Sequence, residues 1–455
     1  MTTSIKQLAM RGAFWTIAAY GCRQAFRLGN NLILTRLLMP EFFGLMALAL
    51  SIKFGIELFS DYGISQSIVN NKRGDEPVFL NTAWTLQVIR GFQVWALSLV
   101  LTLPIAHFYH DDRLLVLIPM VGFASVLDGF VSTSLHTLQR HLDVRRGLIY
   151  ELVTTPLVLG VLILFCWLHP SVWALAWGLL FGSFTHSILS HFLIPGYRNR
   201  FLLDRTVLKE IQSFGKWIAL ASAMMFVADQ SDRFILAKLL SFEKLGVYTI
   251  AYTIASIPRE LIRDLSGRVI FPAISKQVDL PRSVLREKII KQRWLLLLGL
   301  GAVLTLLVCS GDWIITLLYA GRNKHWEQYR DATWMMPILC TGIWFSVLFY
   351  STSPALLAIG KPVYSAQSNF VRFVMIAVGM PLGFSQFGEL GAIVVIALSD
   401  VPLYLVNLYG LHREELSCIL QDIQSTLVFV GILAIALLAR YSLGFGLPIH
   451  VLLDR

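Results

Sequence analysis

The sequence predicts an all-α protein that crosses a membrane many times. Its helices are expected to form two parallel six-helix bundles around a central cavity, with one or two extra spans at the C-terminal end. Three observations predict this fold class. Hydrophobic residues make up 56% of the chain and charged residues 15%, against about 25% charged residues in soluble domains. Thirteen apolar runs approach or exceed the ~20 residues that span a bilayer. One segment near the start of the chain also returns once near its middle.

The apolar runs follow one another with short polar connections. The loops NNKRGDEP and QRHLDVRRG separate runs of the first half, and the basic linker PGYRNRFLLDRTVLKEIQ ends that half. A second basic linker, SKQVDLPRSVLREKIIKQR, follows the eighth run. In chain order the runs are 12–34, 42–69, 78–108, 114–138, 148–168, 172–194, 214–240, 245–273, 294–319, 332–359, 363–384, 390–411 and 426–445.

The returning segment is ILTRLLMPEFFGLMALALSI, at residues 33–52, which matches ILAKLLSFEKLGVYTIAYTI at residues 235–254. Eight positions are identical at the constant offset of 202, among them Glu41/Glu243 and Gly44/Gly246, and Trp15 falls on Trp217. A constant offset near half the chain length indicates an internal duplication. We therefore expect an N-lobe at 1–197 with spans 1–6, a C-lobe at 198–415 with spans 7–12, and an extra span in 416–455.

The positive charges of the loops predict the orientation of the spans. Alternate loops and the N-terminus carry 19 Lys and Arg residues, whereas the opposite set carries 8. Lys and Arg gather in cytoplasmic loops, so the N-terminus is expected in the cytoplasm. Thirteen spans then place the C-terminus outside. Because each half has an even number of spans, the two halves enter from the same side and are parallel repeats.

Charged residues lie inside several apolar runs, where a charge at the centre of a helix costs ~2.5–3.5 kcal/mol even on lenient insertion scales. Such residues have to face a cavity or a partner. A spacing of four residues places Arg23 with Arg27, and Lys53 with Glu57, on single helix faces. Polar stripes on several spans predict a wet central cavity.

Cations outnumber acids in this predicted cavity, and the planar fork of arginine suits bidentate binding of phosphate. We expect an anionic, phosphate-bearing substrate. The alternative is that these residues form internal ion pairs, such as Lys53 with Glu57 or Asp229 with Arg233. The expected substrate-binding residues are Arg23, Arg27, Lys53, Arg90, Arg259, Arg263 and Arg372.

Four acids within the runs are candidates for coupling transport to a proton or a sodium ion, and nothing in the sequence selects among them. They are Glu57, Asp61, Asp229 and Asp400. The five cysteines have no paired spacing, so neither a disulfide nor a metal site is expected. The chain lacks a nucleotide-binding P-loop, an HExxH motif and a glycine-rich dinucleotide fingerprint. We therefore expect a transporter without a cofactor rather than an enzyme. The net charge of +10 is explained by the cytoplasmic loops, so no nucleic-acid partner is expected.

Three motifs resemble a known family. RGAFW in the first run, TRLLMPEFFGLMALA at the first hairpin and FSDYGISQSIV at the end of the second run are similar to the polysaccharide transporter family. These are Wzx-type lipid-linked oligosaccharide flippases of the MOP superfamily, and the likeness is strongest to the exopolysaccharide, colanic-acid-like branch. FPAIS, at residues 271–275, resembles the family's second-half motif. The family usually has twelve or fourteen spans, so a count of thirteen is a departure that leaves the side of the C-terminus open.

The resemblance implies a multi-pass protein of the bacterial inner membrane. Its substrate would be an undecaprenyl-diphosphate-linked oligosaccharide, moved by alternating access for exopolysaccharide, capsule or O-antigen synthesis. Membrane lipids, a polysaccharide polymerase and export machinery are the other partners that it implies.

Other functions remain as alternatives. A multidrug or cation antiporter of the same superfamily would need an acidic, apolar cavity, which the arginines argue against. A membrane polysaccharide polymerase or ligase would need a large outer loop, and the longest one expected, AGRNKHWEQYRD, is short. A major-facilitator transporter of small solutes also has two parallel six-span halves. Its typical loop between spans 2 and 3 is only weakly matched by NNKRGDEP.

Overall fold

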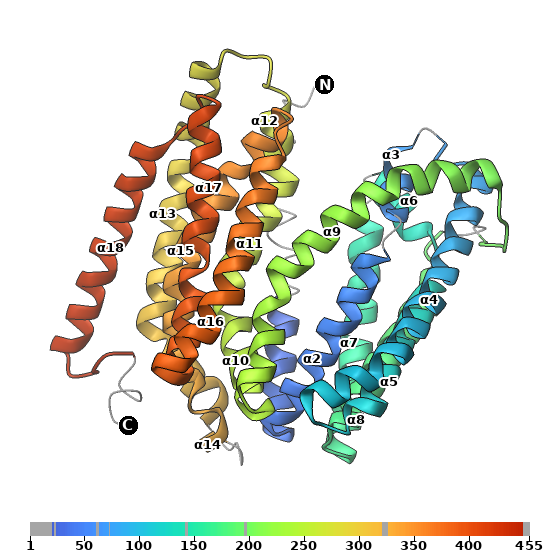
Figure 1. Cartoon of the computed structure of the whole chain (residues 1–455), viewed down its shortest axis with the longest axis horizontal. Helices are drawn as coiled ribbons and strands as arrows, with labels where there is room; N and C mark the ends of the chain where they lie inside the picture. The colour runs from blue at the N-terminus through green and yellow to red at the C-terminus, as the bar shows by residue number, and fades with distance from the viewer. Residues whose placement is uncertain are drawn as a thin grey trace. The chain divides into compact units, whose positions relative to one another are not determined.

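All the regular secondary structure in the residues that the computed structural model describes is helical, with no β-strand among them (Figure 1). These residues are 21, 24–60, 63–71, 73–141, 144–194, 198–320 and 326–448. Contacts within the chain divide it into two compact units. The first unit is Ile33–Gly246, and the second combines Met1–Leu32 with Val247–Arg455. These boundaries are set by contacts between residues. They differ from the lobe boundary between residues 197 and 198, which was predicted from the internal repeat.

The first unit contains the helices that correspond to the predicted second to seventh runs. Helix α4 packs along α5, α7 packs along α8, and α2 packs along α9. The helices are α2 Pro40–Phe59, α3 Ile64–Asn70, α4 Pro77–Tyr109, α5 Leu114–Gly129, α6 Ser134–Arg140, α7 Val144–Leu168, α8 Val172–Ser190 and α9 Arg205–Leu239.

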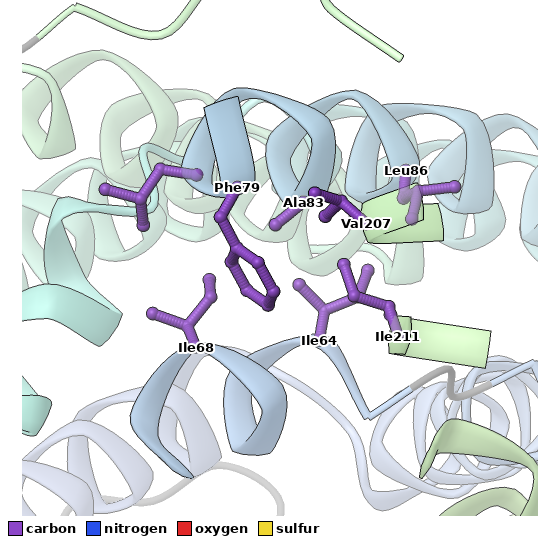
Figure 2. Close-up of a cluster of buried hydrophobic side chains, with 8 residues drawn as sticks. Ile64, Ile68, Phe79, Ala83, Leu86, Val207 and Ile211 are labelled. Carbon is purple, nitrogen blue, oxygen red and sulfur yellow. The ribbon is translucent and has the colours of Figure 1, made fainter. Parts of the chain in front are cut away.

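A buried apolar cluster joins three of these helices. Figure 2 shows Phe79 of α4 extending between Ile64 and Ile68 of α3, with Val207 and Ile211 of α9 beside them. Burying each of these aliphatic or aromatic side chains contributes about 1.5–3 kcal/mol relative to leaving it in water. The cluster fixes the short helix α3 against α4 and α9.

Helix α9 begins inside the stretch that the sequence analysis assigned to a basic linker. The carboxylate of Asp204 accepts hydrogen bonds from the backbone N–H groups of Thr206 and Val207, at 2.9 and 3.0 Å. An aspartate at this position satisfies amides that have no partner within the helix. This cap explains why the helix starts at Arg205, ahead of the apolar run.

The predicted fourth span is broken. Helices α5 and α6 meet at an angle of 64° across residues 130–133. The break opens backbone carbonyls at the C-terminal end of α5. Gln87 of α4 covers them, because its Nε2 donates to the carbonyl oxygens of Asp128, Gly129 and Val131, at 3.2, 3.3 and 3.0 Å.

The two copies of the repeated segment touch each other through their matched glycines. A Cβ atom placed on Gly44 would lie 2.0 Å from the carbonyl oxygen of Phe242, and one placed on Gly246 would lie 1.8 Å from that of Pro40. Residues 40 and 242 are themselves equivalent at the offset of 202. The contact is therefore reciprocal, as a two-fold relation between the hairpins requires. The repeat was predicted from the sequence. The close backbone contact that its two glycines allow was not predicted.

The second unit contains the remaining helices. Helix α15 lies among α13, α16 and α17, and α18 packs along α13. Two π-helical turns, η1 Ser266–Ile270 and η2 Thr316–Ala320, interrupt helical stretches. Besides the helical residues 24–32, the helices are α10 Phe242–Ala255 (which begins in the first unit), α11 Ile257–Leu265, α12 Phe271–Ser275, α13 Arg282–Ile315, α14 Trp326–Tyr329, α15 Ala332–Ala358, α16 Val363–Leu398, α17 Asp400–Arg413 and α18 Ile419–Ser442.

Two buried ion pairs hold α18 on α13. Arg293 Nη2 lies 2.8 Å from Asp422 Oδ1, and their side chains are 4% and 2% exposed. Arg440 pairs with Asp312, with Nη1 2.7 Å from Oδ1. The arginine is thus on α13 in one pair and on α18 in the other. The two α13 residues are 19 positions apart, or roughly 28 Å along a helix, which is close to the ~30 Å hydrocarbon thickness of a bilayer.

Eight helical segments within the described ranges are long and apolar enough to cross a membrane, or nine if α5 and α6 form one bent span. One of the eight joins α16 and α17 as Val363–Arg413, and α18 is another. The thirteenth apolar run is therefore a helix of 24 residues. These helices confirm a multi-pass membrane protein.

Candidate functional site

The first unit contains a cavity of about 450 Å³ whose walls come from α2 to α8. Its polar wall carries two acids, Glu57 and Asp128, together with Arg90, and the remaining walls are mixed. The other residues that line it are Ile64, Ser65, Gln87, Gly91, Val94, Ser125, Gly129, Val131, Leu135, His136, Tyr150 and His186.

Lys53 lies between the two acids. Its Nζ is 2.9 Å from Glu57 Oε1 and 3.3 Å from Asp128 Oδ2, and its side chain is 12% exposed. Ser125 Oγ donates to the same oxygen of Glu57 at 2.8 Å. The pair of Lys53 with Glu57, which was the alternative to substrate binding, is present, and Asp128 makes the site a base held by two acids. The arrangement can hold a cation.

Arg90 faces this cavity and is held by backbone. Its Nη2 donates to the carbonyl oxygen of Glu57 at 2.6 Å. The structure brings together Lys53, Glu57 and Arg90, three charged residues that the sequence places inside apolar runs. Gln87 and Tyr150 were missed because neither carries a charge, and a lone polar residue in an apolar run is a weak signal.

Two histidines complete the cavity. His136 Nδ1 is 3.1 Å from Ser65 Oγ, and His186 Nδ1 is 3.0 Å from the hydroxyl of Tyr150. Each histidine therefore has a neutral hydroxyl partner.

The second unit holds a different charged network around Asp400, at the start of α17. The carboxylate accepts from a guanidinium N–H of Arg259 on α11, and its Oδ1 lies 3.1 Å from Arg372 Nε on α16. Ser346 Oγ on α15 donates to Oδ2 at 2.7 Å. The Asp400 side chain is 1% exposed, and those of Arg259 and Arg372 are 11% and 6% exposed. Here one acid is held by two bases, which is the reverse of the Lys53 site.

Arg27, on the helical stretch before α2, also has an acidic partner in this unit. Its Nη1 lies 3.0 Å from Glu260 of α11, and its Nη2 donates to the carbonyl oxygen of Thr253 at 3.3 Å. Gln24 Nε2 donates to the same carboxylate at 2.9 Å. Arg27 therefore contacts α11 through Glu260, the residue that follows Arg259 in the sequence.

Two further predicted site residues lie on α9 and α11, and two lie outside the described part of the chain. Asp229 is half-buried on α9, and Arg263 is exposed on α11. Arg23 and Asp61 lie outside the described residues. No group of three or more His, Cys, Asp or Glu residues that could hold a metal ion is present in the ranges that the structure describes.

An ion-pair cluster lies in the loop between α4 and α5. Arg113 Nη2 is 2.6 Å from both Glu41 Oε1 and Asp111 Oδ2. The hydrogen bonds with Asp111, and then those with Glu41, raise the pKa of Arg113 above its usual range. Burial alone would raise the pKa of Asp111, but the hydrogen bonds and charge of Arg113 outweigh it and lower that pKa. The repeated Glu41 thus anchors a loop, which is consistent with a structural role for the hairpin.

Comparison with known proteins identifies the family. The family described as "Polysaccharide biosynthesis protein" matches residues 33–331, well over half of the chain. The chain is 24% identical over 282 residues to the lipopolysaccharide biosynthesis protein WzxC of Escherichia coli K12, a match that covers 61% of this chain and 56% of that protein. It therefore spans little more than half the length of that relative.

Solved structures share the fold. The lipid II flippase MurJ in an inward closed conformation has a TM-score of 0.69 at 12% identity, covering 94% of this chain and 92% of MurJ. An inward-facing multidrug resistance MATE transporter of the MOP superfamily has a TM-score of 0.61 at 17% identity, covering 85% of this chain and 93% of that one. At these identities the likeness establishes the all-helical transporter fold. The family match shows that the chain belongs to the polysaccharide biosynthesis protein family, and the solved structures show that it shares its fold with membrane transporters.

Proposed function

We propose that this protein moves an undecaprenyl-diphosphate-linked oligosaccharide from the inner to the outer leaflet of a bacterial inner membrane. The product would serve exopolysaccharide, capsule or O-antigen synthesis, in which a polymerase and export machinery act on it next. The N-terminus would be cytoplasmic, and lobes 1–197 and 198–415 would move against each other in alternating access.

The observation that carries the proposal is the buried network of Arg259, Arg372 and Asp400. Two guanidinium groups share one carboxylate, and all three side chains are nearly inaccessible. Charges in such an environment are retained where they have a partner or a function, because an unpaired charge within a membrane is costly. Arginine is suited to a diphosphate, which it binds through two parallel hydrogen bonds.

Among the other proposed ligands, Arg27 is supported by its ion pair with Glu260, the residue that follows Arg259 on α11. Its side chain is 37% exposed, so a substrate could contact it. Lys53 pairs with Glu57 and Asp128, and Arg90 lines the cavity that contains these two acids. Both are therefore weaker candidates for phosphate ligands than Arg259 and Arg372. Arg23 and Arg263 remain proposals from the sequence.

The cavity of the first unit supports an ion-coupling role for Glu57. Glu57 and Asp128 hold a lysine ammonium at 2.9 and 3.3 Å, so the same oxygens can hold a proton or a small cation. Asp61, Asp229 and Asp400 are the other acids proposed for coupling. The membrane potential also favours transport, since moving negative charge outward is downhill by ~2.3 kcal/mol per charge per 100 mV.

Complementation tests the proposed function. A strain that lacks this protein is supplied with the wild-type gene or with Arg259→Gln, Arg372→Gln or Arg286→Gln, and surface polysaccharide is measured at matched protein levels. Arg286 is an exposed arginine on α13, which makes it a control for the loss of one positive charge. We expect loss of polysaccharide with the first two variants and normal amounts with the control. Normal amounts with all three would refute the proposed phosphate site.

A further inference from the structure

The cavity of the first unit is built around the broken fourth span. Helices α5 and α6 meet there at 64°, and residues from both sides of the break, among them Asp128 and His136, line the cavity. Irregular backbone at membrane depth is tolerated where it lines a polar cavity, and discontinuous helices form the substrate sites of many transporters. The break therefore marks this cavity as a place for a ligand.

The two acids of the cavity keep acceptors that the protein does not use. Glu57 holds Lys53 and the hydroxyl of Ser125 through Oε1, and Asp128 holds Lys53 through Oδ2. The second oxygens, Glu57 Oε2 and Asp128 Oδ1, have no partner among the described residues. These side chains are 24% and 42% exposed. Because an ionised carboxylate only accepts hydrogen bonds, the cavity calls for a ligand that donates them.

The two histidines add groups that can donate or accept. His136 and His186 each use Nδ1 for a neutral hydroxyl partner, and both line the cavity. Within the part of the chain that the structure describes, Nε2 of each ring has no partner. The second nitrogen of a neutral imidazole is a donor or an acceptor according to the tautomer. Polar groups from α2, α5, α6 and α8 thus face one cavity.

The size and the charges of the cavity suit an uncharged polar ligand. A volume of about 450 Å³ lies within the ~300–1,000 Å³ of cavities that hold organic ligands. A single small ion needs far less room, since ~10–15 Å³ is enough for one water molecule. While Lys53 lies between the two acids, its charge repels a second cation, and the acids repel a phosphate. A hexose, which has several hydroxyl donors and no charge, meets neither repulsion.

The cavity lies toward the side on which a substrate would be loaded. Glu57 and His186 are near the C-terminal ends of α2 and α8, and Tyr150 is near the start of α7. The loops after α3, α6 and α8 follow these ends, and their Lys and Arg residues predict that they are cytoplasmic. A lipid-linked glycan in the inner leaflet would present its sugars on that side.

We propose that this cavity is a sugar subsite, which binds one neutral hexose unit of the transported glycan. Asp128 and Glu57 accept hydrogen bonds from its hydroxyl groups, and His136 and His186 complete the contacts. The inference rests on the proposed function, because it takes the cargo to be a glycan. It adds that the first unit reads the sugar, whereas the arginines of the second unit are proposed for the diphosphate.

The test is saturation-transfer difference NMR on the full-length protein in nanodiscs. The probes are the methyl glycosides of glucose, galactose, mannose and N-acetylglucosamine, with glucuronic acid as the charged comparison. We expect a saturable signal from at least one neutral glycoside and a weaker one from glucuronic acid. Asp128→Ala should raise Kd about tenfold or more, and His136→Ala about threefold or more, because each removes a hydrogen-bonding group.

Three variants separate the sugar subsite from a general effect on structure. Val131→Phe adds bulk to the wall of the cavity and keeps its polar side chains, so it should abolish sugar binding. Asp279→Asn and His169→Ala change an exposed acid and an exposed histidine outside the cavity and should leave Kd unchanged. The melting temperature of each variant is measured alongside, and a variant that does not fold is left out of the comparison, which the other two cavity variants then carry.

Each result counts for or against the subsite. No saturable signal from any neutral glycoside, equal Kd values in wild type and all the folded cavity variants, or tighter binding of glucuronic acid would overturn it. Uptake of a free radiolabelled glycoside by proteoliposomes would assign the cavity to a free sugar and would also overturn it. Complementation with the wild-type gene tests the proposed function separately. Restored surface polysaccharide without sugar binding refutes the subsite alone, whereas failure of wild type to restore it refutes the proposed function and the inference with it.

Discussion

The reciprocal contact of Gly44 and Gly246 gives a sharp prediction about packing. A methyl group added at Gly246 would lie 1.8 Å from the oxygen and 2.6 Å from the carbon of the Pro40 carbonyl. These are backbone atoms, which cannot rotate away as a side chain can. Carbon atoms prefer separations of ~3.5–4.0 Å, so the two segments would have to move apart by roughly 1 Å or more.

The expected destabilisation follows from two opposing effects. Overpacking of this kind typically costs about 1–3 kcal/mol, and a contact this short belongs at the upper end. Replacing glycine by alanine within a helix contributes about 1 kcal/mol in the opposite direction. We therefore expect Gly246→Ala to lower the free energy of unfolding by roughly 2 kcal/mol.

Thermal unfolding in detergent measures this effect, with Gly431→Ala as the matched control. Gly431 lies within α18, and a Cβ atom there would meet nothing within 4 Å. The control should gain about 0.5–1 kcal/mol from helix propensity. The double variant Gly44→Ala with Gly246→Ala should lose less than the sum of the single losses, because one separation relieves both contacts. Wild-type stability of Gly246→Ala would refute the close contact.

Three further predictions concern charges. Arg293→Ala should lower the free energy of unfolding by about 3–5 kcal/mol, because it leaves Asp422 buried without its charged partner. The double variant Arg293→Met with Asp422→Leu should change the free energy of unfolding little. Thermal unfolding compares the two variants, and equal losses of stability would contradict the pairing. Asp111 has a lowered pKa, so its pair with Arg113 should stabilise the fold above the unfolded pKa of about 3.9 and lose that contribution as the pH falls further. A plot of melting temperature against pH from 6 to 3 should therefore fall more steeply for wild type than for Arg113→Gln, and parallel curves would count against the pair. Glu57→Gln should weaken the dependence of transport on an ion gradient. Transport in proteoliposomes with and without the gradient measures this dependence, and an unchanged dependence would exclude Glu57 from ion coupling.

The sequence alone predicted the features that depend on composition and on the spacing of residues along the chain. Apolar runs predicted the helices, and the constant offset identified the repeat at residues 33–52 and 235–254. The spacing of Lys53 and Glu57 placed them on one helix face, and their ion pair, which was the alternative to a substrate-binding role for Lys53, is present in the structure. Each of these depends on residues that are near one another in the sequence or recur at a constant distance.

The features that the sequence could not predict depend on which helices become neighbours. Asp312 and Arg440 are single charges in separate apolar runs, and only the packing of α18 on α13 pairs them. Asp400 was a candidate for ion coupling. Its pairing with Arg259 and Arg372 was not predicted, because these arginines lie 141 and 28 positions away in the sequence. The break after Gly129 has no proline in it, so no local signal marked the end of α5.

The central claim is that buried arginines recognise the diphosphate of a lipid-linked glycan during its passage across the membrane. Its most direct test is a flipping assay in proteoliposomes, in which a polyprenyl-diphosphate oligosaccharide becomes accessible to a glycan-modifying enzyme outside the vesicle. We predict protein-dependent exposure with wild type and Arg286→Gln, and strongly reduced exposure with Arg259→Gln and Arg372→Gln. Equal exposure with all four proteins, or none with wild type, would contradict the account.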